Sequence, residues 1–169
     1  MSDFFPTRRD WTHPVLGHYA DASLFFPQTD LDTVAIRCRG RLVYLASPFT
    51  KLVVGADGHY DFGRGLVAAT YAARWSRRLA AVGVTAVSPI IQAVEMVHGD
   101  SPPILDPLDQ KFWTCWCAPL LQACRAVVVP PIPGWAESDG VWRELRAALT
   151  AGRSVFQVDS GALVSGGVA

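Results

Sequence analysis

A single glutamate, Glu144, has the surroundings that a catalytic carboxylate needs. It ends the segment RAVVVPPIPGWAESDGVWRE (125–144), which is typical of a short buried strand, a proline-rich loop and a helix capped by Ser138. Open α/β sheets bind ligands where a strand ends and feeds a helix. Four residues turn a helix by about 400°, so Gly140 faces the same side as Glu144 and leaves room beside it. We therefore predict that Glu144 is catalytic, the alternative being a solvated helix glutamate.

The elements that would position Glu144 alternate between strand and helix along most of the chain. Such alternation is typical of a parallel sheet with helices on both faces. The predicted fold class is α/β: a Rossmann-like (flavodoxin-like) three-layer sandwich with a mostly parallel sheet of about four or five strands. We expect strands within 41–47, 84–89, 126–129 and 153–159, a glycine-rich loop over 51–65, a short helical turn within 90–99, and helices over 66–82, 108–124 and 138–151, the second of these kinked or divided at Pro119.

The first 40 residues have prolines and aromatic side chains but no clean periodicity. We interpret 1–40 as an N-terminal extension of a domain that spans 41–169, with a short edge strand at Thr33–Cys38. An apolar aromatic segment of this kind is suited to contact with another subunit, so we expect a homo-oligomer. The aromatic residues concerned are Phe4, Phe5, Trp11, Phe25 and Phe26.

Composition narrows the function classes. The chain has 169 residues, of which half are apolar, and its formal net charge is zero, so neither nucleic acid nor a membrane surface is an expected partner. The absence of a signal peptide and of a long apolar run predicts a cytoplasmic protein. The four cysteines lack metal-ligand spacing and are expected to be reduced thiols. We expect neither a metal nor an organic cofactor.

Three segments resemble the nucleoside 2-deoxyribosyltransferase superfamily, and especially an uncharacterised bacterial and phage branch of it. They are VYLASPF (43–49), VSPI (87–90) and PGWAESDGVWREL (133–145), and the resemblance covers roughly residues 41–158. In that family a glutamate attacks the anomeric carbon of the sugar, displaces the base and forms a covalent glycosyl intermediate. The resemblance puts Glu144 in this role, which suits the oxocarbenium-like transition state of glycosidic cleavage.

Candidate substrate contacts follow partly from the resemblance and partly from position. The resemblance implies that the turn after the first strand lines the sugar pocket and that Gln92 reads the base edge, although a surface glutamine is the simpler interpretation. Ser138 suits both a helix cap and a substrate contact, and Tyr44 suits packing in the sheet. The predicted substrate-binding residues are Tyr44, Ala46, Ser47, Phe49, Gln92, Trp135, Ser138 and Gly140.

The chain departs from the family pattern at the proton donor. Cys117 and Arg125 stand at two positions where family members carry aspartates, and a thiol is a poor substitute for an acid–base carboxylate. Asp109 and Asp139 are the candidate replacements. Two main hypotheses therefore stay open: an enzyme that cleaves or exchanges the base of a nucleoside or nucleoside 5′-monophosphate, and a non-catalytic nucleotide-binding module. A third is an interaction protein that binds its partner through residues 1–40.

Overall fold

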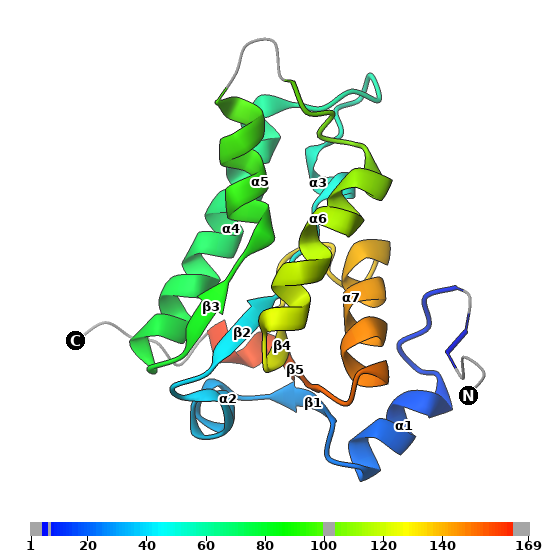
Figure 1. Cartoon of the computed structure of the whole chain (residues 1–169), viewed down its shortest axis with the longest axis vertical. Coiled ribbons are helices and arrows are strands. Elements are labelled where there is room, and N and C mark those ends of the chain that lie inside the picture. Colours follow the sequence, from blue (N-terminus) through cyan, green and yellow to red (C-terminus); the bar gives the residue numbers. More distant parts are fainter. Residues whose placement is uncertain (1–4, 7, 100–103, 164–169) are drawn as a thin grey trace.

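A computed structural model describes residues 5–6, 8–99 and 104–163, and this part of the chain forms one parallel sheet of five strands (Figure 1). The order across the sheet is β1-β5-β4-β2-β3, and every pairing is parallel. This confirms the predicted α/β class and its parallel sheet. The strands are β1 (Phe25–Thr29), β2 (Leu42–Leu45), β3 (Thr85–Val87), β4 (Ala126–Val129) and β5 (Ser154–Val158).

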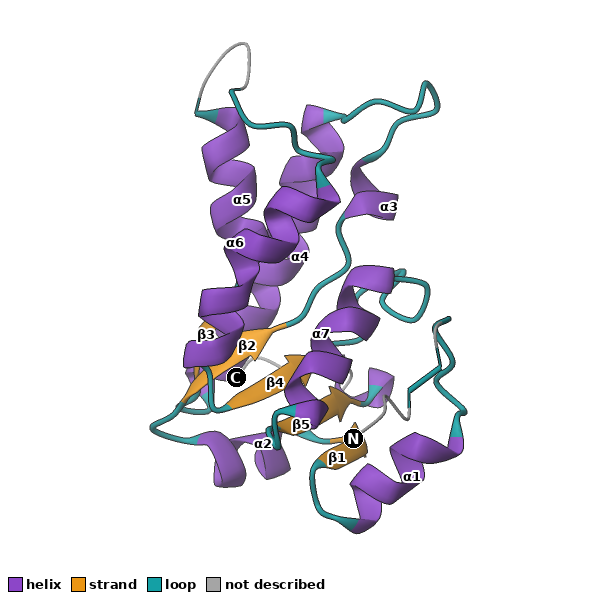
Figure 2. Cartoon of the chain, turned by 45° about the vertical axis from the view of Figure 1, so that its right-hand side comes forward, coloured by secondary structure: helices purple, strands orange, loops and turns teal. Residues whose placement is uncertain are grey.

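Helices cover both faces of the sheet (Figure 2). One face packs against α1 (Pro14–Asp21), α6 (Gln110–Ala123) and α7 (Asp139–Thr150). The other face packs against α2 (Leu31–Cys38) and α4 (Phe62–Ala81). The three-layer arrangement is therefore also confirmed. None of the helices in the described ranges is both long and apolar enough to cross a membrane.

Alternation of side chains along the central strands produces the two cores. Tyr44 and Val127 point into the core beneath α6 and α7, whereas Val43 and Val128 point into the core beneath α2 and α4. All four are fully buried. Strands covered on both faces need apolar side chains at every position, which explains the unbroken run of apolar residues in β4.

A second group of helices extends beyond the carboxyl ends of the strands. The connection from β2 contains α3 (Thr50–Val53), and α5 (Pro89–His98) follows β3 directly. In Figure 1, α4, α5 and the first half of α6 rise above the sheet, and α4 packs along α5. Residues 160–163 form a 3-10 turn (Ser160–Leu163) after β5. These helices are therefore placed to form walls around a site at the carboxyl end of β2.

The N-terminal segment differs from its expected structure. Thr33–Cys38, predicted as an edge strand, belongs to helix α2, because Asp30 caps that helix by accepting a hydrogen bond from the Thr33 amide at 2.6 Å. Residues 34, 35 and 38 then pack into the core at helical spacing. The edge strand is instead β1, which pairs with β5.

The aromatic residues of this segment that the structure describes pack within the chain, and the expected homo-oligomer stays a prediction. Phe5 is 6% exposed and stacks on Tyr19, and Phe25 is 5% exposed. Trp11 packs edge-on against two tryptophans, and Phe26 stacks on Phe156. Phe4 lies outside the described residues. These side chains join α1 and β1 to the rest of the fold.

Three helices also differ from the sequence prediction, in where they begin, how long they are or whether they are divided. Helix α4 begins at Phe62 rather than at residue 66, because Asp61 caps it by accepting a hydrogen bond from the Arg64 amide. The short turn expected within 90–99 is the ten-residue helix α5. Helix α6 runs without division through Pro119, so of the two alternatives at this proline, a kink or a second helical segment, the second is wrong.

Candidate functional site

The strand order creates a switch point beside β2. The chain leaves β2 toward β3 on one side and leaves β4 toward β5 on the other, so the two connections diverge. In open α/β sheets this divergence opens a crevice at the carboxyl ends of the strands. A cavity of 270 Å³ lies here, walled by the loop after β2 and by α5, α6 and α7.

Tyr44 and Glu144 meet at this cavity from elements 100 residues apart in the chain. Tyr44 is fully buried on β2, and its hydroxyl donates a hydrogen bond to Glu144 Oε1 at 2.5 Å. Glu144 projects from the second turn of α7 and is only partly exposed. The bond holds the carboxylate in one orientation, with its exposed part facing the cavity.

Burial changes the acid–base properties of this pair. Burial raises the pKa of Glu144 from its ordinary 4.5 to about 7, and the Tyr44 hydrogen bond and the Arg143 charge lower it by less. Near neutral pH both the carboxylate and the carboxylic acid are therefore populated. The pKa of Tyr44 is raised far above its ordinary value by burial and by the negative charge of Glu144, so Tyr44 stays a hydrogen-bond donor.

Cys117 completes the floor of the cavity beside Tyr44. Burial and the Glu144 charge raise the pKa of its thiol to about 11, although a hydrogen bond with Tyr44 and the charge of Arg143 oppose the rise. The thiol is therefore protonated at neutral pH. It can donate a weak hydrogen bond but is a poor acid and a poor nucleophile in this state.

One stripe of α7 faces the cavity, as the sequence predicted. Gly140, Arg143, Glu144 and Ala147 line it at the three- and four-residue spacing of a helix face. Ser138 caps the helix by accepting a hydrogen bond from the Val141 amide at 3.3 Å, and it also lines the cavity. The predicted helix start and the shared side of Gly140 and Glu144 are thus confirmed.

A second stripe, on α6, lines the opposite wall and was missed. Trp113, which the sequence does not single out, lines the cavity, and its indole nitrogen donates to the Asp106 carbonyl at 2.9 Å. The signal was the helical spacing of a set that mixes polar and apolar side chains. The stripe consists of Gln110, Trp113, Thr114, Cys117, Ala118 and Leu121.

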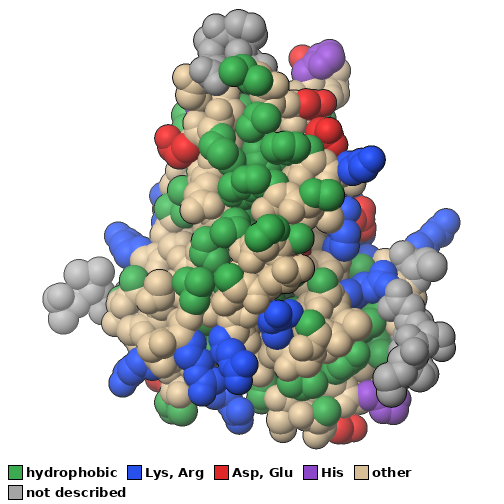
Figure 3. All heavy atoms as spheres, viewed as in Figure 1, with side chains coloured by type: hydrophobic (Ala, Val, Ile, Leu, Met, Phe, Trp, Pro, Cys, Tyr) green, Lys and Arg blue, Asp and Glu red, His purple; other side chains and the backbone are tan. Residues whose placement is uncertain are grey.

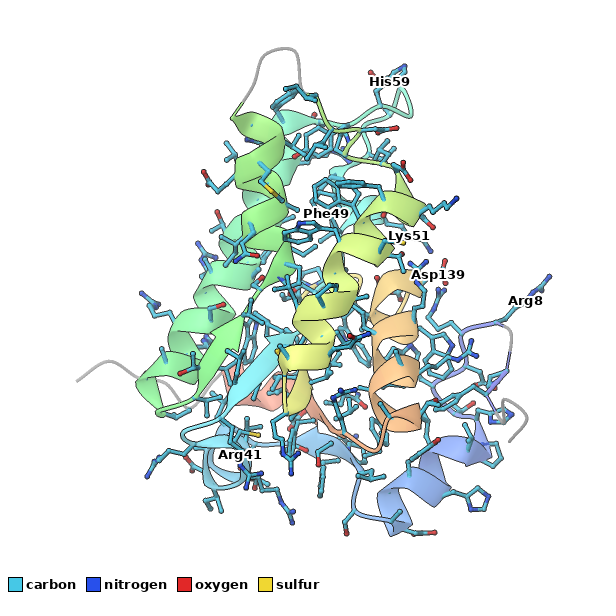
Figure 4. The ribbon with its side chains drawn as sticks, viewed as in Figure 1. Arg8, Arg41, Phe49, Lys51, His59 and Asp139 are labelled. Atoms are coloured by element: carbon cyan, nitrogen blue, oxygen red, sulfur yellow. The ribbon has the colours of Figure 1, made fainter. Side chains whose placement is uncertain are left out.

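The loop after β2 supplies the third wall. Ser47 and Phe49 line the cavity as predicted, and the buried Ser47 hydroxyl has no hydrogen-bond partner among the described residues. Lys51 also lines the cavity, and its ammonium group donates to the Glu137 carbonyl at 2.9 Å, which ties the loop to the start of α7. Figure 4 shows Phe49 between α5 and α6, and Lys51 near Asp139.

Three predicted substrate contacts do not line the cavity. Ala46 is fully buried in the core beneath α6 and α7, and its amide donates to β4. Gln92 is exposed on α5, because it lies about 200° around the helix from Ile90, which does face the cavity. Trp135 packs on Trp11 instead, so the loop that carries it is turned toward the N-terminal segment.

The two candidate proton donors, Asp109 and Asp139, both form other interactions in the structure. Asp109 lies outside the cavity wall and caps α6 by accepting a hydrogen bond from the Phe112 amide at 2.9 Å. Asp139 lines the cavity but forms an ion pair with Arg9. In the described part of the chain, no group of three His, Cys, Asp or Glu side chains is arranged to hold a metal ion.

The chain belongs to a family described as a domain of unknown function (DUF1937), whose model matches residues 41–160. The match includes β2 to β5 and every residue described above as lining the cavity. No curated protein matches the sequence significantly.

Proposed function

We propose that this protein cleaves the N-glycosidic bond of a nucleoside or nucleoside 5′-monophosphate, or exchanges its base, with Glu144 as the nucleophile. One observation carries the proposal: a carboxylate with a pKa of about 7, oriented by a buried tyrosine, faces a small cavity at the switch point of the sheet. The resemblance of 43–49, 87–90 and 133–145 to the nucleoside 2-deoxyribosyltransferase superfamily also supports it.

The reaction needs one ionised carboxylate and one proton. Glu144 in its carboxylate form attacks C1′ of the sugar, the C1′–N bond breaks, and its electron pair leaves with the base, which takes up a proton. A water molecule or a second base then attacks C1′ and releases Glu144. Tyr44 keeps its own proton throughout and positions the carboxylate, so we regard it as a positioning residue.

The walls suit a flat heterocycle and a sugar of limited size. Phe49 and Trp113 offer aromatic faces, against which a base can stack. The unpartnered Ser47 hydroxyl is available to a polar group of the ligand. At 270 Å³ the cavity is near the lower end of the ~300–1,000 Å³ that ligand sites commonly span. It therefore favours one nucleoside or mononucleotide.

The second candidate, a non-catalytic nucleotide-binding module, is favoured by the state of the proton donors. Asp139 is paired with Arg9, and the thiol of Cys117 has a pKa of about 11. The carboxylate of Asp139 is engaged by Arg9, and the thiol of Cys117 does not give up its proton readily at neutral pH. If the leaving base takes its proton from water, the first proposal holds; otherwise the cavity binds a nucleotide without turning it over.

A base-release assay separates the two candidates. The protein is incubated with ribo- and deoxyribonucleosides and their 5′-monophosphates, with and without a second free base, and chromatography measures freed or exchanged base. We expect release that Glu144→Gln abolishes and that Glu95→Gln leaves unchanged, since Glu95 is exposed on α5 away from the cavity. Binding of a nucleotide without release, equal in the parent and in Glu144→Gln, would support the binding module instead.

A further inference from the structure

A second cavity, of 490 Å³, opens at the opposite edge of the sheet, at the amino ends of β2, β4 and β5. Four arginines from three separate segments line it, and the lining includes no aspartate or glutamate. Figure 3 shows Lys and Arg side chains gathered at the lower end of the molecule, where Figure 4 places Arg41. The four are Arg37, Arg41, Arg125 and Arg153. We propose that this cavity binds a small ligand that carries several phosphate charges.

The positions of these arginines are fixed by the fold. The backbone amides of Arg41, Arg125 and Arg153 each donate to a carbonyl oxygen, at 3.0, 2.9 and 2.9 Å. The Arg37 guanidinium lies 4.5 Å from the centre of the Phe26 ring, which holds its side chain over an aromatic face. The Arg153 guanidinium donates to the Gln122 carbonyl at 3.1 Å, so two of the four cations are already held in place. A site of this kind loses less entropy when an anion binds.

Their charge is not neutralised by carboxylates. Among the described residues, none of the four guanidinium groups forms an ion pair with Asp or Glu. Because the formal net charge of the whole chain is zero, four unpaired arginines around one cavity are a strong local excess of positive charge.

The negative ends of helices account for only part of this excess. Helices α2, α6 and α7 end beside the cavity, at Cys38, Ala123 and Thr150. Each helix C-terminus is equivalent to about half a negative charge, so the three together offset less than half of the four positive charges. Arginines that served the helix ends alone would not need to converge from three segments on one cavity.

The shape and chemistry of the cavity favour phosphate groups on a small molecule. Guanidinium groups pair with phosphate oxygens through two parallel hydrogen bonds, and Ser154 adds a hydroxyl to the lining. A volume of 490 Å³ falls in the ~300–1,000 Å³ range of small-molecule sites. A concave site of this size accommodates a short chain of phosphates rather than the length of a nucleic acid.

Isothermal titration calorimetry with sodium tripolyphosphate tests this proposal. We expect saturable binding to one site, weakened roughly tenfold or more in the double variant Arg41→Gln, Arg125→Gln. The matched control is Arg74→Gln, Arg77→Gln, which removes the same charge from exposed positions on α4 and should change the affinity by less than about twofold. If the first double variant fails to fold, the single variants Arg41→Gln and Arg125→Gln decide the question, since both side chains are exposed.

Three results would overturn the proposal. The first is the absence of saturable tripolyphosphate binding to the parent protein. The second is an equal loss of binding in both double variants, which would mean that general charge attraction is responsible. The third is that a single-stranded oligonucleotide, and not tripolyphosphate, binds in a manner that requires Arg41 and Arg125; the surface would then serve nucleic acid.

Discussion

Replacing Glu144 with glutamine should make the protein more stable at high pH. Burial raises the pKa of Glu144 from 4.5 to about 7. At any pH where Glu144 is ionised in the unfolded chain, folding is therefore less favourable than it would be with an ordinary pKa. The sign follows from proton counts: between pH 4.5 and 7 the folded state holds more protons, so stability falls as pH rises through this window. A shift of this size corresponds to about 3 kcal/mol once both states are ionised.

Glutamine has the shape of glutamate, accepts a hydrogen bond from Tyr44 and does not titrate. The advantage of Glu144→Gln over the parent should therefore be about 2 kcal/mol larger at pH 8 than at pH 5. For a chain of 169 residues this is a difference of roughly 4–8 °C in Tm. Comparing the two pH values cancels every effect of the substitution that does not depend on protons.

Urea and thermal unfolding at pH 5 and pH 8 measure this difference. Glu95→Gln is the matched control, because it makes the same chemical change at an exposed position outside the cavity. The control should differ from the parent by less than about 0.5 kcal/mol at both pH values. If the Glu144→Gln advantage were the same at pH 5 and pH 8, the carboxylate would have no raised pKa, and the electrostatic description of the site would be wrong.

Substitutions at three further positions test other contacts. Tyr44→Phe removes the hydrogen bond that lowers the pKa of Glu144, so this pKa should rise further. The pH at which stability falls, or at which activity rises, should then move to a higher value. An unchanged profile would contradict the pairing. Ser138→Ala should cost about 1 kcal/mol in urea unfolding, while Ser138→Asp should preserve the cap and the stability. Gly65→Ala would drive a methyl group into the Tyr60 hydroxyl, which bonds to His98 at 2.9 Å, and should cost about 1–3 kcal/mol; a neutral result would show that this contact can relax.

Local patterns were sufficient to predict the segment that carries Glu144. The apolar run of β4 and the Ser138 cap lie close together in the chain, and each is recognised from residue types alone. Prediction failed at 33–38 because β-branched residues there suggested a strand, whereas the Asp30 cap and core packing determine a helix.

The partner of Glu144 could not be predicted from local patterns. Tyr44 lies 100 residues away, and only the order of strands in the sheet brings the two together. The ion pair between Arg9 and Asp139 likewise joins residues 130 positions apart, which no local pattern connects. The α6 stripe was readable in principle, since Trp113, Cys117 and Leu121 recur at four-residue spacing.

The most direct test of the central claim is to identify the residue that carries the sugar. A nucleoside found to release its base is prepared with fluorine at C2′, which slows breakdown of the intermediate, and the quenched protein is digested and analysed by mass spectrometry. We expect one glycosyl group on Glu144, absent from Glu144→Gln and present in Glu95→Gln. Base release with the sugar on another residue, or with no covalent sugar at any time, would contradict the role assigned to Glu144.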